Sequence, residues 1–116
     1  MTEEALTPVL CVSNTDAAVE WYRRLGFAVD YEHSSGPSFN RTTVLLRRDE
    51  LRLILSNREE DAHGTGLIVM RLSGVAAIAG EFGIEITETP VARHFELTDP
   101  DGNRLRIAEP RMERRA

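Results

Sequence analysis

The sequence FELTDPDGNRLRI, residues 95–107, places two arms of alternating apolar and polar residues around a turn. Pro100 presets one backbone dihedral of the turn, and Gly102 or Asn103 tolerates the positive one. The arms, expected at residues 93–98 and 104–108, therefore predict a β-hairpin. Because side chains alternate across a strand, its phenylalanine, leucines and isoleucine should pack under a helix, and its charged residues should face away.

Outward from this hairpin, the same order of elements is found twice along the chain. In the second half, strands are predicted at residues 67–72 and 84–89, with a helix between them at 74–82 that ends at Gly83. In the first half, a helix should begin at Asn14-Thr15-Asp16, whose side chains can cap it, and end at Gly26. The strands of this half are expected at residues 6–13, 27–33, 42–48 and 51–57.

The repeated order predicts an internal duplication. Two βαβββ modules, residues 6–57 and 67–108, are joined by a polar connector at 58–66. The 116 residues are enough for one domain with a core, so we expect a single domain over 1–116 that ends in a polar tail, 109–116.

The composition is that of a soluble globular protein, with 41% hydrophobic and 28% charged residues. The net charge of −5 disfavours nucleic acid as a partner and fits a neutral or cationic one. The acidic N-terminal stretch is unlike a secretory signal and no segment could span a membrane, so we expect a cytoplasmic protein without a membrane partner. The single cysteine, Cys11, cannot form an intramolecular disulfide and is interpreted as a buried, unreactive thiol.

Several segments resemble a known family. The stretch TPVLCV at residues 7–12, EWY at 20–22, RLGF at 24–27 and FELTDPDGN at 95–103 are similar to the glyoxalase/bleomycin resistance protein/dioxygenase (vicinal-oxygen-chelate) superfamily, in its bleomycin-resistance-like branch. The resemblance implies an α+β fold in which two βαβββ modules form curled mixed sheets, an open cup with the helices outside. It also implies a homodimer.

Strand alternation predicts which side chains face the cup. Thr7, Val9 and Cys11 should face it from the first strand, and Ser56 from the fourth. Ion pairing with Arg104 or Arg106 is favoured for Glu96 over a role as general base. The candidate ligand-binding residues are Val9, Tyr31, His33, Phe39, Arg52, Ile54, Leu67, Val69, His94, Glu96, Arg104 and Arg106.

Metal-dependent relatives place one ligand on each of four inner-facing strands, and the resemblance maps these positions onto Thr7, Ile54, Leu67 and Arg106. None of these residues is a credible ligand, since the ligands of such sites are typically His or Glu, and the charge of Arg106 would repel a cation. The three histidines, His33, His63 and His94, form no metal-binding motif. We therefore expect no metal, no cofactor and no catalytic residue.

The function implied by the resemblance is non-catalytic binding and sequestration of an antibiotic, bleomycin-like or a related natural product that is aromatic or cationic. The bleomycin binders carry a tryptophan before the hairpin turn, where this chain has PVARH at residues 90–94, and the inward arginines would suit carbonyl, phenolate or carboxylate groups. Phe39 could contact the ligand or plug the space beneath its loop, whereas Trp21 and Tyr22 are expected in the core or an interface. A glyoxalase-type lyase or dioxygenase-like enzyme and a regulatory dimeric module remain as alternatives.

Overall fold

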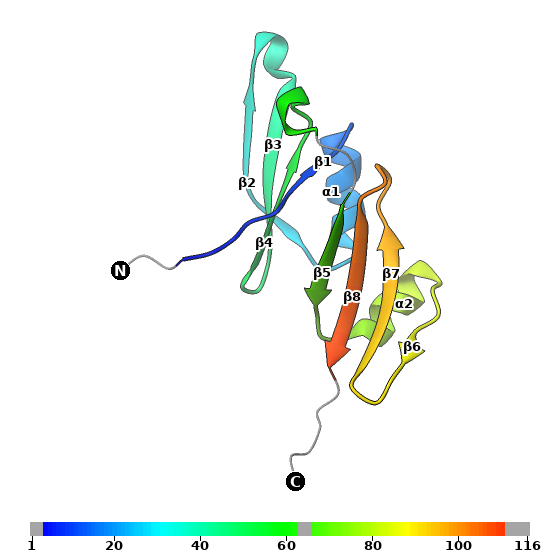
Figure 1. Cartoon of the computed structure of the whole chain (residues 1–116). Helices are drawn as coiled ribbons and strands as arrows, with labels where there is room; N and C mark the ends of the chain where they lie inside the picture. Colours follow the sequence, from blue (N-terminus) through cyan, green and yellow to red (C-terminus); the bar gives the residue numbers. More distant parts are fainter. Residues whose placement is uncertain (1–3, 63–65, 111–116) are drawn as a thin grey trace. The chain divides into compact units, whose positions relative to one another are not determined.

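The computed structural model describes residues 4–62 and 66–110. The chain divides into two compact units, Met1–Gly64 and Thr65–Ala116, and each contains one four-stranded mixed sheet and one α-helix (Figure 1). The predicted α+β fold with two βαβββ modules is therefore confirmed. His63 and the arginines of the predicted tail beyond Pro110 lie outside the described residues. None of the described helices is long and apolar enough to cross a membrane.

The first unit contains one sheet with strand order β1-β4-β3-β2, in which β1 runs parallel to β4 and the other pairs are antiparallel. Two short 3-10 helices, η1 (Pro37–Phe39) and η2 (Glu59–Asp61), follow β2 and β4. The longer elements are β1 (Val9–Cys11), α1 (Thr15–Arg23), β2 (Ala28–Ser35), β3 (Arg41–Arg48) and β4 (Leu51–Ser56).

Helix α1 begins and ends where the sequence predicts. The Asn14 side-chain oxygen accepts a hydrogen bond from the Ala17 amide at 3.0 Å, which satisfies one of the free N–H groups of the first turn. Gly26 lies beyond the helix with φ of 90°, a conformation that a side chain would strain. On the helix face that meets the sheet, Tyr22 is fully buried, which confirms its place in the core.

Alternation along the strands separates the core of the first unit from its open face. Leu53 and Leu55 on β4 are buried beside Val44 and Leu46 on β3. Each such leucine contributes about 1.5–3 kcal/mol through burial of its apolar surface. Leu53 and Leu55 therefore belong to the core on the helix side of the sheet, whereas Leu51, at the hairpin end of β4, is exposed.

The second unit repeats this arrangement with strand order β5-β8-β7-β6. Strand β5 runs parallel to β8, and the remaining pairs are antiparallel. The elements are β5 (Leu67–Arg71), α2 (Val75–Phe82), β6 (Thr87–Glu88), β7 (Ala92–Thr98) and β8 (Arg104–Pro110). Phe95 and Leu97 are buried on the same side as Leu105 and Ile107, as the hairpin pattern predicts.

The turn between β7 and β8 is held by a buried carboxylate. One oxygen of Asp99 accepts hydrogen bonds from the amides of Asp101 and Asn103, both at 2.9 Å. The other oxygen accepts from the Asn103 side-chain amide at 2.9 Å. Gly102 has φ of 90°, so it is the turn residue that needs the left-handed region. This geometry fixes the register of the two strands.

Helix α2 lacks a capping side chain of its own, because its N-cap residue is Gly74. The carboxylate of Glu109 on β8 takes this role and accepts a hydrogen bond from the Val75 amide at 3.4 Å. Glu109 also lies 3.2 Å from the guanidinium of Arg93. The Val75 amide first, and then Arg93 and the Gly74 amide, hold the pKa of Glu109 below its ordinary value.

Several predicted boundaries are wrong. Strand β1 begins at Val9, so Thr7 lies outside it, and β6 has only two residues, Thr87 and Glu88, instead of the stretch 84–89. Strand β8 continues through Pro110 into the predicted tail, because Ala92 and Arg93 of β7 extend the ladder to meet it. These differences arise because pairing partners, and not local propensity, decide how far a strand extends.

A β-bulge changes the direction of the side chains on β2. Val29 pairs with Leu46 and Tyr31 with Leu45, so Asp30 is the extra residue. Leu46 faces α1 and Leu45 faces away from it, as their burial shows. Strict alternation from Val29 would direct Tyr31 toward the helix side, but the bulge places it on the open face.

Candidate ligand-binding faces

The sheet of the first unit carries a row of apolar side chains on the face that α1 leaves uncovered. Val9 pairs with Ile54, Ile54 pairs with Leu45, and Leu45 pairs with Tyr31. Paired residues point to the same face, so these four form one continuous row across all four strands, here called the apolar row. Tyr31 is 63% exposed. Three of the predicted site residues, Val9, Tyr31 and Ile54, are thus brought together.

The neighbouring row on this face is polar and consists of Cys11, Ser56, Thr43 and His33. Ser56 lies on the face opposite the buried leucines, as predicted, but it is not open to solvent. It is fully buried, and its hydroxyl donates to Asp61 of η2 at 2.6 Å. Cys11 is half-buried instead of buried. His33 is exposed and lies beside Tyr31 on the open face.

Arg52 lies in the row on the other side of the apolar row, where it pairs with Arg47, and Phe39 lies in η1. Arg52 donates to the carbonyl oxygens of Asp49 at 3.2 Å and Leu51 at 3.3 Å, so its guanidinium is held by its own hairpin. Phe39 ends η1 with φ of 51° and is 73% exposed. The interpretation of Phe39 as a plug beneath the loop is therefore wrong, because a plug would be buried and this side chain is mostly exposed in its own unit.

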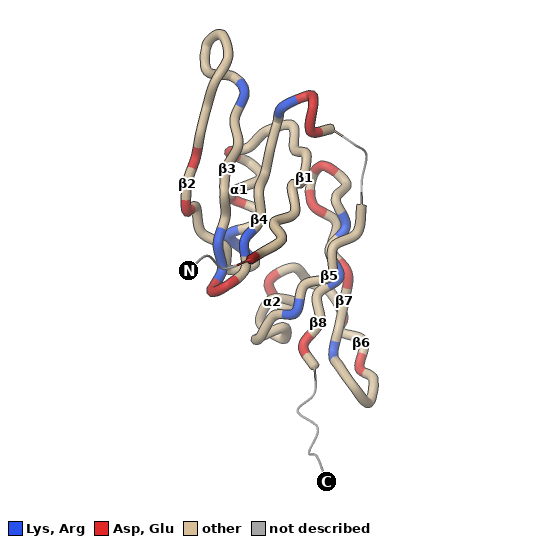
Figure 2. Tube along the Cα trace, turned by 60° about the vertical axis from the view of Figure 1, so that its left-hand side comes forward, with Lys and Arg blue, Asp and Glu red and all other residues tan. Residues whose placement is uncertain are grey.

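The open face of the second sheet is more polar. Its rows across the strands are Leu67 with Arg104, then Val69 with Arg106 and Glu96, then Arg71 with Ala108, His94 and Thr87. All six site residues predicted in this half, which are Leu67, Val69, His94, Glu96, Arg104 and Arg106, lie on this one face. Figure 2 shows how positive and negative residues are distributed along these strands.

Glu96 is held between two arginines of β8. Arg104 Nε donates to Glu96 Oε2 at 2.7 Å, and a guanidinium nitrogen of Arg106 lies 3.7 Å from Glu96 Oε1. The hydrogen bond from Arg104, followed by the charges of both arginines, holds the pKa of Glu96 below its ordinary value. The same contact raises the pKa of Arg104. The predicted ion pairing is confirmed, and a carboxylate with a lowered pKa is a weak general base.

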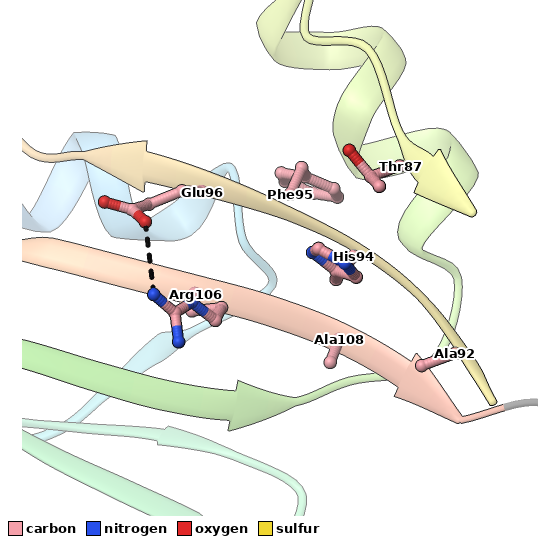
Figure 3. A pocket seen from close by; sticks show the side chains of 7 residues that line it. All are labelled: Thr87, Ala92, His94, Phe95, Glu96, Arg106 and Ala108. Atoms are coloured by element: carbon pink, nitrogen blue, oxygen red, sulfur yellow. Dashed lines mark ion pairs between the residues drawn. The ribbon is translucent and has the colours of Figure 1, made fainter. Parts of the chain in front are cut away.

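A hollow opens beside this ion pair. Its volume is about 520 Å³, and Figure 3 shows the side chains that line it, which are Thr87, Ala92, His94, Phe95, Glu96, Arg106 and Ala108. Three of these, His94, Glu96 and Arg106, were predicted site residues. Thr87 was missed because the sequence does not show that β6 pairs with β7 opposite His94, and Ala92 was missed because β7 begins one residue earlier than predicted. A ligand-sized space with a few converging polar groups is typical of binding sites.

The four positions that would hold a metal do not provide a ligand set. Ile54 and Leu67 have hydrocarbon side chains, and the guanidinium of Arg106 is a cation paired with Glu96. Thr7 lies before β1 and is exposed. Over residues 4–62 and 66–110, no group of three or more His, Cys, Asp or Glu side chains is arranged to hold a metal ion. The residues present therefore do not fit the metal of the metal-dependent relatives.

Two βαβββ modules, each with one uncovered sheet face, define a vicinal-oxygen-chelate fold. The comparison with family models agrees, since residues 1–113 match the model described as glyoxalase superfamily protein. The chain belongs to the glyoxalase superfamily. No curated protein matches the sequence.

Solved structures with the same fold include both binding proteins and proteins described as glyoxalases. A bleomycin-binding protein solved in complex with bleomycin is 23% identical, with a TM-score of 0.64 and 93% of this chain and 98% of that chain covered. A bleomycin resistance determinant encoded on the transposon Tn5 is 24% identical, with a TM-score of 0.62 and coverage of 93% and 98%. A putative glyoxalase family protein from Bacillus anthracis has a TM-score of 0.70 at 12% identity, with coverage of 96% and 98%. At these identities the likeness shows the fold alone.

Proposed function

We propose that this protein binds a small organic molecule on its open sheet faces and sequesters it without chemical reaction. The ligand class is an antibiotic, bleomycin-like or a related natural product, and binding would confer resistance. The observation that carries the proposal is that each sheet has an uncovered face, while the residues at the four positions implied for a metal do not form a ligand set. We also propose that the protein acts in the cytoplasm, as its sequence indicates, and that it is a homodimer, as its resemblance to the bleomycin-resistance-like branch implies.

The side chains on the open faces are better suited to binding a ligand than to catalysing a reaction on it. The apolar row offers hydrocarbon and aromatic surface, which a flat ligand would cover. In the second unit, Glu96 is ionised and held by two arginines, so it is poorly placed to accept a proton in a reaction. The charged and polar groups there can orient a ligand, and none of these contacts requires a chemical step.

The test is thermal unfolding of the metal-free protein against a panel of antitumour antibiotics and a panel of divalent metals. A ligand at one hundred times its dissociation constant stabilises the folded state by about 2.7 kcal/mol, which is a readily measured shift. Tyr31→Ala should reduce the shift, because it shortens the apolar row. Val91→Ala is the matched control, since Val91 is 69% exposed but lies outside the strands of either sheet.

A shift with an antibiotic that Tyr31→Ala weakens and Val91→Ala leaves intact supports sequestration. Stabilisation by a metal alone would refute it and favour the second candidate, a glyoxalase-type lyase or dioxygenase-like enzyme, for which membership of the glyoxalase superfamily is the supporting observation. If neither panel has any effect, sequestration is refuted and a regulatory dimeric module is favoured instead.

A further inference from the structure

We propose that the hollow on the second sheet binds the carboxylate group of an organic ligand, with the guanidinium of Arg106 as its main partner. This inference rests on the proposed function, because it names the chemical class of the ligand. A carboxylate ligand differs from the neutral or cationic partner that the net charge of the chain favours. Its basis is the shape of the hollow, the charge of the sheet face and the number of hydrogen-bond donors without partners.

The hollow exists because two alanines lie where longer side chains would fill the face. Ala108 is flanked on one side by Arg71 of β5 and on the other by His94 of β7. Ala92 lies two residues before His94 on the same side of β7. Their methyl groups leave space over the sheet, and Figure 3 shows His94 between the Glu96–Arg106 pair and Thr87.

The hollow itself is lined by one positive and one negative side chain, Arg106 and Glu96. The open face on which it lies is positive, although the whole chain carries −5. Arg71, Arg104 and Arg106 lie on this open face. Among the described strand residues of the same face, Glu96 is the one carboxylate, so two positive charges remain in excess. A cationic ligand would be repelled here, whereas an anion would be attracted.

Several hydrogen-bond donors that line the hollow are available to a ligand. Arg106 makes one loose ion pair at 3.7 Å, which leaves most of its N–H groups available. Within the described part of the chain, no hydrogen bond engages the His94 ring or the Thr87 hydroxyl, both of which line the hollow. A planar carboxylate accepts two parallel hydrogen bonds from a guanidinium, which a neutral amide cannot match.

The size of the hollow indicates that the carboxylate belongs to a larger organic molecule. A volume of about 520 Å³ is within the range of sites for small organic ligands and exceeds that of a lone carboxylate. The methyl groups of Ala92 and Ala108 provide apolar surface for the rest of the ligand. Glu96 keeps Arg106 in place and does not bind the ligand in this arrangement.

The probe is benzoate, compared with its neutral analogue benzamide, in a titration followed by NMR of the His94 ring and the Ala92 and Ala108 methyl groups. Benzoate should move all three signals, and benzamide should bind at least about tenfold more weakly. Arg106→Gln should weaken benzoate about tenfold without affecting benzamide, because it removes the charge and keeps a polar side chain. Ala108→Leu should abolish both by filling the hollow.

The matched control is Arg47→Gln, which removes an exposed arginine from the open face of the other unit. It should leave benzoate binding unchanged, and backbone amide spectra establish that each variant is folded. The inference is overturned if benzoate and benzamide bind equally, if Arg106→Gln and Arg47→Gln act alike, or if Ala108→Leu still binds benzoate.

The proposed function can fail separately. If antibiotics stabilise the protein but neither Arg106→Gln nor Ala108→Leu changes benzoate or antibiotic binding, the carboxylate site is refuted and sequestration stands. If benzoate behaves as expected but no antibiotic binds, the site stands and sequestration is refuted.

Discussion

Replacement of Asp99 by alanine should destabilise the β7–β8 hairpin, which carries most of the hollow. Asp99 is 4% exposed, and its carboxylate accepts three hydrogen bonds, two from backbone amides and one from the side chain of Asn103. At about 1 kcal/mol for each hydrogen bond, the loss is about 3 kcal/mol. The estimate is a lower one, because the Asn103 side chain is buried and would keep an unsatisfied donor.

The assay is hydrogen exchange of the backbone amides in β7 and β8, compared between the wild type and Asp99→Ala. A loss of about 3 kcal/mol corresponds to exchange roughly one hundred-fold faster in this hairpin. Chemical denaturation followed by circular dichroism provides an independent measure of the free energy of unfolding. Fluorescence of Trp21, which lies on α1, reports on the first unit.

Two further variants make the result specific. Asp99→Asn keeps one oxygen for the backbone amides but turns an NH₂ group toward the Asn103 side chain, so it should fall between the wild type and Asp99→Ala. Thr98→Ala changes an exposed neighbour in the same hairpin and should stay within about 0.5 kcal/mol of the wild type. A loss below about 1 kcal/mol in Asp99→Ala would show that the carboxylate does not hold the turn.

Three other predictions concern charged and exposed residues. The carboxyl of Glu96 should titrate in NMR below its ordinary pKa of about 4.5, and Arg104→Gln should raise that pKa; an unchanged titration would refute the contact. The folded-state pKa of Glu109 is lowered, so its capping contribution to stability is present above the unfolded pKa and lost as the pH falls through the folded pKa. Glu109→Ala should remove this pH dependence and speed hydrogen exchange at the Val75 amide, with Glu109→Gln intermediate. Equal exchange rates in the wild type and both variants would contradict the capping role of Glu109. Phe39→Ser should leave the free energy of unfolding within about 0.5 kcal/mol and lower antibiotic affinity if the η1 loop contacts the ligand; a larger loss of stability would mean that Phe39 packs in a core.

The core of each unit could be predicted from the sequence because it depends on local alternation. Leu53 and Leu55 are buried, as are Leu105 and Ile107, and both pairs follow from the period of a strand. The ends of α1 were equally predictable, since Asn14 and Gly26 are residues whose local chemistry starts and ends a helix. Such features need no knowledge of distant partners.

The site was predictable only in part, because several of its residues depend on pairing between separate segments. Ser56 is covered by η2, which follows it in the chain, and no local pattern shows that Asp61 folds back onto it. Thr87 reaches the hollow because β6 pairs opposite His94, and Ala92 reaches it because β7 starts earlier than predicted. Glu109, assigned to a polar tail, continues β8 and caps α2. Each case is a tertiary contact that overrides local propensity.

The bulge at Asp30 also bears on whether β2 can pair with a strand of another molecule. Strand β2 is an edge strand, exposed along most of its eight residues, and a regular edge of that length can recruit a strand from another molecule. The extra residue interrupts the ladder and twists the strand, and Asp30 and Glu32 add two like charges that repel an identical edge. Both features oppose edge-to-edge pairing and involve residues outside the core, so we expect deletion of Asp30 to promote such association without loosening the packing behind it.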